Sequence, residues 1–384
     1  MKWKVEKMIN AAYLHIPFCE HICHYCDFNK VFLKGQPVTE YLLAMEQEIK
    51  LTFEQNSPPD RLKTIFVGGG TPTALTEQQL LLFCEIIKNN LPFDHETEFT
   101  FEANPGDLSK EKFQILKQAG VNRISFGVQT FNNELLKRIG RTHRAEDVFK
   151  SVELAKETGF ENISVDLIYS LPGQTIQDFK QTLSKAFSLD ITHYSGYSLI
   201  IEPKTVFYNL LSKGKLPTQS EDIETEMYEI LMDEMDKNGF NQYEISNFGL
   251  PGFESKHNLT YWNNESYYGF GAGAHSYVNG SRRSNYGPLK KYMDPIKRGQ
   301  LPILDNHEVT KREAIEEEMF LGLRKIAGVS LSHFREKFAE DPLALFQDEI
   351  ADLLNRGLIE INHDMIFLTK QGKFLGNEVF QSFI

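Results

Sequence analysis

The chain has 384 residues, of which 41% are hydrophobic and 24% charged, and its formal net charge is −12. This length suits a barrel-sized domain with a smaller second one, and the composition excludes a disordered chain. The negative charge argues against nucleic acid as a partner. No apolar stretch approaches the roughly 18 residues that span a bilayer, and no signal segment precedes residue 19, so we expect a cytoplasmic protein without a transmembrane segment.

Strand-like and helix-like segments alternate from residue 12 to about residue 200. Thr76 and Ser109 are suited to begin helices, and Gly120 and Gly159 to end them. Alternating units of this kind predict a parallel sheet with right-handed crossovers. Six strands are too few for a closed barrel of eight, so we predict an open, partial barrel with its site at the carboxyl ends of the strands. The expected strands cover 12–16, 63–68, 97–102, 122–127, 162–166 and 193–199.

The pattern divides the chain into three parts. Residues 1–240 should hold the barrel, and residues 241–306, rich in Tyr, Asn and Gly, an irregular connecting segment. Residues 307–384 should form a smaller α+β domain with a winged-helix-like order, in which helical stretches lead to two short strands and a last helix. This part has 14 Asp and Glu against 9 Lys and Arg, which argues against DNA binding through phosphate contacts.

Three of the four cysteines crowd into one stretch directly after the first predicted strand. Cys19, Cys23 and Cys26 have the spacing C-x3-C-x2-C, whereas Cys84 lies alone in an apolar helical run and should be a core residue. Clustered cysteines in a cytosolic chain favour cofactor or metal chemistry. Three thiolates on a [4Fe–4S] cluster leave the fourth iron open. An open iron can bind the amino and carboxylate groups of S-adenosylmethionine (SAM), whose reductive cleavage gives a 5′-deoxyadenosyl radical.

Zinc is the rival interpretation of the cysteines, with His15, His21 or His24 as the fourth ligand. Zinc sites usually combine two cysteine or cysteine–histidine pairs across a longer loop. No second pair is present in this sequence. The spacing therefore favours the cluster and leaves zinc as the alternative.

Other polar or flexible residues follow the later strands. A glycine-rich turn at 68–71 follows the second strand, where glycine lets backbone approach a ligand closely. Glu102 ends the third strand, Gln129 follows the fourth and Asp166 ends the fifth. Because the carboxyl ends of parallel strands meet at one edge, we expect these side chains to converge with the cysteines.

Several segments together resemble one branch of the radical-SAM superfamily, the coproporphyrinogen dehydrogenase (HemN-like) branch, over nearly the whole chain. These segments are HIPFC, GGGTP, EANP, FGVQTF and DLIYSLPGQT. The resemblance implies a partial (β/α)6 radical-SAM barrel that carries a [4Fe–4S] cluster and SAM. By position it places Tyr13 against the cluster, and Gly69, Gly70 and Thr71 at the amino-acid end of SAM. It also implies four polar residues around SAM sites, of which the last three can instead serve a second SAM: Glu102, Gln129, Arg141 and Asp166. For Arg141, an ordinary surface arginine is the alternative.

The same branch contains enzymes that decarboxylate coproporphyrinogen III and the HemW-type chaperones that carry heme. The enzymes usually have a further cysteine where this chain has Phe28, and a longer N-terminal lead. Residues 257–262 match the HNxxYW motif associated with the chaperones, and 269–277 and 368–380 fit the same group. The resemblance therefore implies a heme chaperone that transfers heme to an acceptor protein. The oxygen-independent dehydrogenase is the alternative, and a winged-helix regulator is disfavoured by the acidic C-terminal part.

The HNxxYW motif also has a physical reading. His257 suits an axial ligand of heme iron through a neutral nitrogen, and Tyr261 and Trp262 offer flat faces to the macrocycle. From the residues alone, the alternative is a loop held in place by an internally hydrogen-bonded His257. His275 is a second candidate ligand. Catalytic residues, a peripheral membrane contact and a homodimer stay open.

Overall fold

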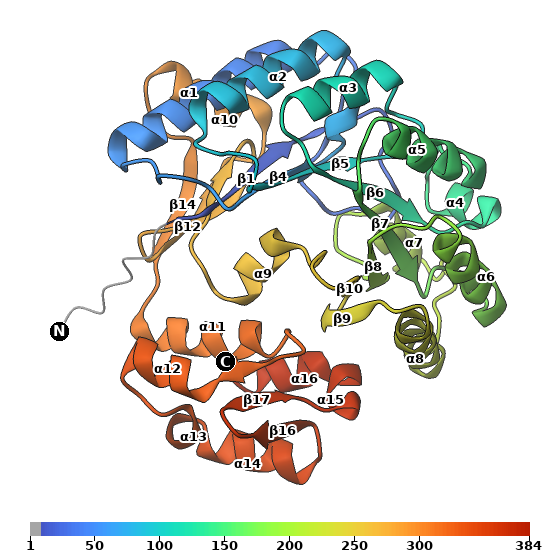
Figure 1. Ribbon diagram of the computed structural model, residues 1–384, viewed down its shortest axis with the longest axis vertical. Coiled ribbons are helices and arrows are strands. Elements are labelled where there is room, and N and C mark those ends of the chain that lie inside the picture. The colour runs from blue at the N-terminus through green and yellow to red at the C-terminus, as the bar shows by residue number, and fades with distance from the viewer. Residues whose placement is uncertain (1–8) are drawn as a thin grey trace.

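A computed structural model describes residues 9–384 of the chain. It consists of one large sheet with helices on its outer face and a smaller unit packed beneath it (Figure 1). The large sheet has nine strands in the order β11-β1-β4-β5-β6-β7-β8-β10-β9. Its two end strands do not pair with each other, so the barrel is open. The predicted partial barrel is therefore confirmed.

The centre of the sheet is made by the six strands that the sequence predicts. Each pairs with the next in parallel, as strands joined by crossover helices must. Alternating polar and apolar residues place one face of each strand in the barrel and the other under the helices. The six are β1 (Ala11–Ile16), β4 (Thr64–Gly69), β5 (Glu98–Ala103), β6 (Arg123–Gln129), β7 (Asn162–Tyr169) and β8 (His193–Ser198).

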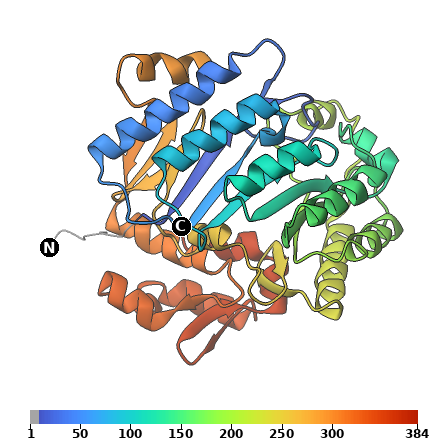
Figure 2. The ribbon, with the colours of Figure 1, turned by 45° about the horizontal axis from the view of Figure 1, so that its top comes forward.

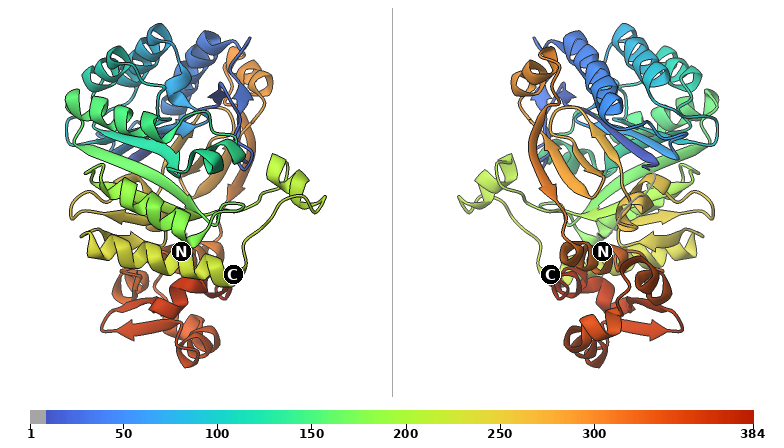
Figure 3. Two further views of the ribbon diagram at one scale, coloured as in Figure 1. Left: turned by 90° about the vertical axis from the view of Figure 1, so that its right-hand side faces the viewer. Right: turned by 90° about the vertical axis from the view of Figure 1, so that its left-hand side faces the viewer.

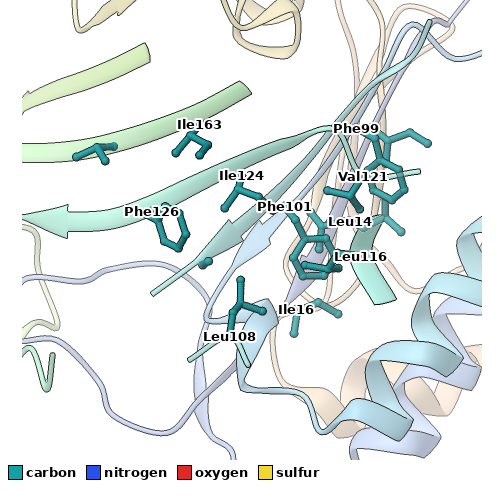
Figure 4. Packing of buried hydrophobic residues seen from close by; sticks show 14 of the residues in the cluster. Leu14, Ile16, Phe99, Phe101, Leu108, Leu116, Val121, Ile124, Phe126 and Ile163 are labelled. Carbon is teal, nitrogen blue, oxygen red and sulfur yellow. The ribbon is translucent and has the colours of Figure 1, made fainter. Parts of the chain in front are cut away.

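Helices cover the outer face of these strands (Figure 2). Thr76 and Ser109 cap the N-termini of two of them, because their side chains accept hydrogen bonds from Gln79 N and Lys112 N. Apolar residues from the helices and strands interlock between the two layers (Figure 4). The covering helices are α1 (Val38–Gln55), α2 (Glu77–Asn90), α3 (Lys110–Gln118), α4 (Asn133–Arg138), α5 (Ala145–Glu157) and α6 (Ile176–Phe187).

Residues 241–306 differ from the irregular connecting segment expected from the sequence, because they extend the sheet at both ends. β11 (Tyr268–Phe270) pairs in parallel with β1, while β10 (Asn247–Gly249) is antiparallel to β8 and carries β9 (Asn241–Glu244). A short helix, α9 (Lys256–Trp262), lies between these strands in sequence. The segment is thus part of the barrel rather than a linker.

The same segment supplies a small second sheet beside β11. Its three antiparallel strands are β12 (His275–Val278), β13 (Ser281–Asn285) and β14 (Ile303–Glu308). The helix α10 (Leu289–Lys297) lies against α1 (Figure 1). Glu48 of α1 ties this region together, since its buried carboxyl group accepts hydrogen bonds from Gly271 N, Asn285 Nδ2 and Tyr292 Oη.

An arm leaves the body of the molecule after β8. It carries α7 (Val206–Leu211), which projects from the barrel (Figure 3), and it returns to α8 (Glu221–Lys237) on the outer face. The short strand β2 (Phe18–Cys19) pairs with β3 (Val31–Phe32) and closes the cysteine loop between them. No described helix is long and apolar enough to cross a membrane.

The smaller C-terminal unit has its own hydrophobic core, which includes Phe334, Leu353, Ile366 and Val379. Three strands form its sheet in the order β15-β17-β16, and helices surround them. A smaller C-terminal domain is therefore confirmed. Its elements are α11 (Lys311–Gly322), β15 (Val329–Ser330), α12 (Leu331–Phe338), α13 (Pro342–Leu345), α14 (Gln347–Asn355), β16 (Ile359–Asn362), β17 (Met365–Leu368), α15 (Lys370–Phe374) and α16 (Gly376–Gln381).

Candidate functional site

A cavity of about 420 Å³ opens at the carboxyl ends of the central strands. Its size lies within the range of about 300–1,000 Å³ that is usual for small-molecule pockets. Ten of the residues singled out from the sequence line it together: Cys19, Cys23, Cys26, Gly69, Gly70, Thr71, Glu102, Gln129, Arg141 and Asp166. The structure thus brings the cysteine motif and the polar strand ends into one site.

The cysteine loop is held by backbone contacts on both sides. Cys19 ends β2, and its Sγ accepts a hydrogen bond of 3.5 Å from Thr71 Oγ1. His24 lies inside the loop and donates from its N–H to the carbonyl of Ile139 at 3.0 Å. The carbonyl of His24 accepts from Phe207 N of α7, also at 3.0 Å. The loop therefore has a defined path without any cofactor contact.

The three thiols of the loop line the same pocket, as the ligands of one cluster would. Burial raises the pKa of Cys19, and it raises the pKa of Cys26 to about 11. Among residues 9–384, no three His, Cys, Asp or Glu side chains converge closely enough to hold a single metal ion. One zinc ion would need such convergence, whereas the thiolates of a cubane bind three separate irons. All four cysteines are free thiols, and Cys84 is buried in the core as expected.

The histidines considered as a fourth zinc ligand lie in different surroundings. His15 is buried, with Nδ1 at 2.9 Å from Tyr13 Oη and Nε2 at 2.7 Å from the carbonyl of Asn29. His24 Nδ1 lies 2.9 Å from the carbonyl of Arg138. His21 lines the pocket. Two of the three rings are therefore engaged with backbone groups, which reduces the case for zinc.

The glycine-rich turn after β4 lies directly against the start of the cysteine loop. Gly70 N and Thr71 N donate to the carbonyls of Ile16 and Phe18 at 2.8 and 2.9 Å. A Cβ atom added at Gly70 would lie 2.7 Å from the backbone carbon of Pro17, which is closer than real contacts allow. Glycine is thus required there by the approach of two backbones.

Two half-buried carboxyl groups form the floor of the pocket. Glu102 Oε2 accepts a hydrogen bond from Gly69 N at 3.0 Å, and Asp166 accepts from Ser125 Oγ at 3.3 Å. Burial, together with the charge of Asp166, raises the pKa of Glu102 to about 8, and burial also raises the pKa of Asp166. A cationic ligand would favour the ionised forms, so the floor is suited to bind positive charge.

Arg141 and Gln129 form one wall. Arg141 is half-buried and lines the pocket, and its Nη1 donates to Asn104 Oδ1 at 2.5 Å. Burial opposes its charge, but the neighbouring Tyr25 and Cys23 raise the pKa of the guanidinium. Gln129 lies at an irregularity of β6 and has a φ of 65°, a conformation that costs a non-glycine residue energy. That turn of the backbone places Gln129 at the pocket.

Tyr13 lies inside the barrel and does not line the cavity. It is two residues before His15 on the same face of β1, and its ring stacks on Phe66 with centroids 6.1 Å apart. The expected contact of Tyr13 with a cluster or SAM therefore stays a prediction. In this structure its hydroxyl group meets His15 instead.

The HNxxYW motif does not line the pocket and lies at the amino end of the barrel. His257 N donates to Glu98 Oε1 at the start of β5, and the ring stacks on Phe66 with centroids 5.1 Å apart. His257 Nδ1 lies 2.8 Å from Thr64 Oγ1, and Nε2 lies 2.8 Å from Tyr261 Oη. Both ring nitrogens are therefore engaged, and the side chain is 1% exposed.

This arrangement matches the alternative of an internally hydrogen-bonded histidine, and ligation of heme iron by His257 stays a prediction. Burial and the charge of Arg123 lower the pKa of His257 to about 3, which keeps the ring neutral. Trp262 faces the C-terminal domain, where Arg324 lies over its ring at 5.1 Å and over the ring of Phe380 at 4.6 Å. The motif closes the base of the barrel and joins it to the second domain. In contrast, the ring of His275 is exposed at the start of β12.

Sequence reasoning missed several residues that line the pocket. Asn104 belongs to the EANP segment, which was singled out for Glu102, and His143 lies two residues after Arg141. Tyr25 lies within the cysteine motif itself. Ile200 is another missed residue; it forms an apolar rim with Phe28, which the sequence had singled out only as the replacement of a cysteine and which is 60% exposed. Their positions next to recognised residues were the only signal in the sequence.

Two family models match separate stretches of the chain. The model described as the radical SAM superfamily matches residues 13–186, and the model described as the HemN C-terminal domain matches residues 309–375. The first stretch contains β1 through most of α6, with the cysteine loop and the pocket floor. The second falls within the C-terminal domain.

Curated relatives match the chain along nearly its whole length. The heme chaperone HemW of Bacillus subtilis (strain 168) is 57% identical over 377 residues, which cover 98% of this chain and 99% of that protein. The heme chaperone HemW of Lactococcus lactis subsp. lactis (strain IL1403) is 49% identical over 376 residues, covering 98% and 97%.

Among solved structures, coproporphyrinogen III oxidase (HemN) from Escherichia coli, described as a radical SAM enzyme, has a TM-score of 0.85. The match covers 98% of this chain and 90% of that one. Because the sequence identity is 23%, this likeness shows the fold alone.

Proposed function

Because the chain belongs to the HemW family of heme chaperones, within the radical SAM superfamily, we propose that it binds heme and transfers it to an acceptor protein. The observation that carries this proposal is the 57% identity to a heme chaperone along the full length of both chains. The cytoplasm is the proposed setting. Gel filtration and liposome sedimentation with heme-loaded protein measure whether a second copy or a membrane surface takes part.

The pocket supports a [4Fe–4S] cluster on Cys19, Cys23 and Cys26, with SAM beside it. When bound, the two supply one-electron chemistry at an iron that no protein ligand occupies. Gly69 and Gly70 line the pocket beside the loop, and the carboxyl group of Glu102 favours a positively charged group. Four further pocket residues would border SAM, or a second SAM: Thr71, Gln129, Arg141 and Asp166.

Heme is the cargo, and we propose that its axial ligand is His275 in preference to His257. Coordination by His257 would require both of its hydrogen bonds, to Thr64 and Tyr261, to break and the base of the barrel to open. The exposed ring of His275 meets no such obstacle. Its cross-strand partner in β13 is the small residue Ser284.

The runner-up function is oxidative decarboxylation of coproporphyrinogen III. The fold similarity to the E. coli oxidase favours it only at the level of architecture. Phe28 on the rim of the pocket stands where those enzymes usually carry a further cysteine. The carrier therefore has the stronger support.

Two assays on cluster-loaded protein separate the functions. A heme titration should end at about one heme per chain, and coproporphyrinogen III with SAM and a reductant should remain unconverted. His275→Ala should lose or shift the Soret band while the iron content is kept. His257→Ala should retain the band, and His95→Ala, at another exposed histidine, is the control. Conversion of coproporphyrinogen III at a useful rate would refute the carrier function.

A further inference from the structure

His143 is a buried histidine on the pocket wall with an unused nitrogen. Within residues 9–384, two buried side-chain atoms of pocket residues lack a hydrogen-bond partner, namely Arg141 Nε and His143 Nε2. His143 is 7% exposed, so water does not reach its ring freely. Buried polar atoms nearly always have a partner, and an exception at a ligand pocket indicates a partner on the ligand.

The surroundings of the ring decide what that partner must be. Burial and the charge of Arg141 lower the pKa of His143 to about 4, so the ring is neutral near pH 7. A hydrogen bond from the His143 ring to the backbone of Val128 raises the pKa, but by less than burial and Arg141 lower it. Since Nε2 has no partner, this bond uses Nδ1 as the donor. Nε2 then carries the lone pair of the ring and can only accept a hydrogen bond.

The loop that carries His143 is rigid enough to define a binding position. Arg141 N donates to the carbonyl of Leu136 at 2.9 Å, and Asp147 Oδ2 accepts from Arg144 N at 2.9 Å where α5 begins. Arg141 adds a spare donor, its Nε–H, two residues away from the spare acceptor. The wall therefore offers one donor and one acceptor to a ligand.

We propose that His143 accepts a hydrogen bond from the adenosyl group of bound SAM and so contributes to its affinity and specificity. The inference rests on the proposed binding of SAM beside the cluster. The amino and carboxylate groups of SAM are then taken by the open iron, which leaves the adenine amine and the ribose hydroxyls as donors. Heme with ionised propionates offers no N–H or O–H donor to this wall. A neutral hydrogen-bond acceptor on the wall therefore favours the adenosyl group of SAM over heme.

The first test compares SAM affinity between variants of cluster-loaded, reduced protein. SAM is titrated while the electron paramagnetic resonance spectrum of the cluster is recorded. His143→Phe keeps the ring volume but removes the acceptor, so SAM should bind roughly three- to tenfold more weakly, as expected for one neutral hydrogen bond. His143→Gln supplies an amide oxygen and should recover most of the affinity. His95→Phe, far from the pocket, should change nothing.

The second test uses the wild-type protein, so it does not depend on the folding of a variant. S-inosylmethionine lacks the adenine amine, and the 2′-deoxy and 3′-deoxy analogues of SAM each lack one hydroxyl. One of the three should bind wild-type protein more weakly than SAM, and His143→Phe should not distinguish it from SAM. This result identifies the donor.

The inference would be overturned if His143→Phe bound SAM as tightly as the wild type does. It would also be overturned if both proteins discriminated equally between SAM and each of the three analogues. A wild-type spectrum that does not respond to SAM at all would have the same consequence. Heme titrations on the same samples distinguish a failure of this inference from a failure of the proposed heme-carrier function. A protein that binds SAM through His143 but takes up no heme would support the inference and refute the carrier.

Discussion

Replacing Glu102 by Gln should stabilise the protein and weaken SAM binding at the same time. The pKa of Glu102 is raised from 4.5 to about 8 in the folded chain, chiefly by burial. A raised carboxyl pKa means that stability is fully present below about pH 4.5 and is lost as the pH rises through 8. At pH 7 the loss is about 2.5 pK units, or roughly 3 kcal/mol. Gln does not titrate, and its oxygen can still accept from Gly69 N.

The assay is denaturant unfolding of cluster-free protein at a series of pH values, followed by SAM titration of cluster-loaded protein. The stability gain of Glu102→Gln should grow by roughly 3 kcal/mol between pH 4.5 and pH 7. SAM affinity at pH 7 should fall by about ten- to a hundredfold, because a charge-assisted contact is lost. Affinity of the wild type should rise with pH up to about 8, more steeply than that of the variant.

Glu48→Gln is the matched control. This carboxyl group is also buried, and burial raises its pKa to about 7, but it lies between α1 and α10 outside the pocket. It should gain stability with the same sign of pH dependence and leave SAM affinity unchanged. If Glu102→Gln gains no stability between pH 4.5 and pH 7, or binds SAM as tightly as the wild type, the reasoning about the pocket floor is refuted.

Three other predictions concern the loop, the turn and the base of the barrel. Alanine at any one of the three pocket cysteines should abolish iron and sulfide binding, whereas Cys84→Ala should keep both; stoichiometric zinc in anaerobically purified protein would contradict this. Gly70→Ala should destabilise the protein by about 1–3 kcal/mol and lower the yield of cluster, because its Cβ meets the backbone of Pro17; normal cluster content and melting temperature would contradict it. His257→Ala should destabilise the protein by about 2–4 kcal/mol, since Thr64 and Tyr261 lose their partner; an unchanged unfolding midpoint would show that the base of the barrel does not depend on this ring.

The central strands were predictable because their pattern is local. Each expected strand begins within one residue of the observed one, since a run of alternating or β-branched residues is visible without knowledge of its neighbours. β10 and β11 were not predictable: Asn247–Gly249 and Tyr268–Phe270 are too short and contain glycine, and only pairing with β8 and β1 makes them strands. Pairing is a tertiary effect that a single sequence does not display.

The residues of the site likewise divide into those that could be predicted from the sequence and those that could not. Residues at strand ends could be predicted together because parallel strands place their carboxyl ends at one edge. His257 was assigned to heme by its motif, but its contacts at the amino ends of β4 and β5 could not be predicted, because only the packing of distant segments reveals them. His143 had no pattern of its own, since a lone histidine in a loop looks the same on a surface and on a pocket wall.

The hydrogen bond between α7 and the cysteine loop makes the stability of the proposed cluster site depend on a segment that is distant in sequence. Phe207 N holds the carbonyl of His24, and the projecting arm continues to the exposed Lys213 and Lys215. A trypsin-like cut at either lysine would release the arm from one side and remove a brace from the loop. Chelators and oxygen would then reach the cysteines more easily. In cluster-loaded protein, proteolysis of the arm during purification should therefore first reduce the visible absorption of the cluster, before any loss of secondary structure.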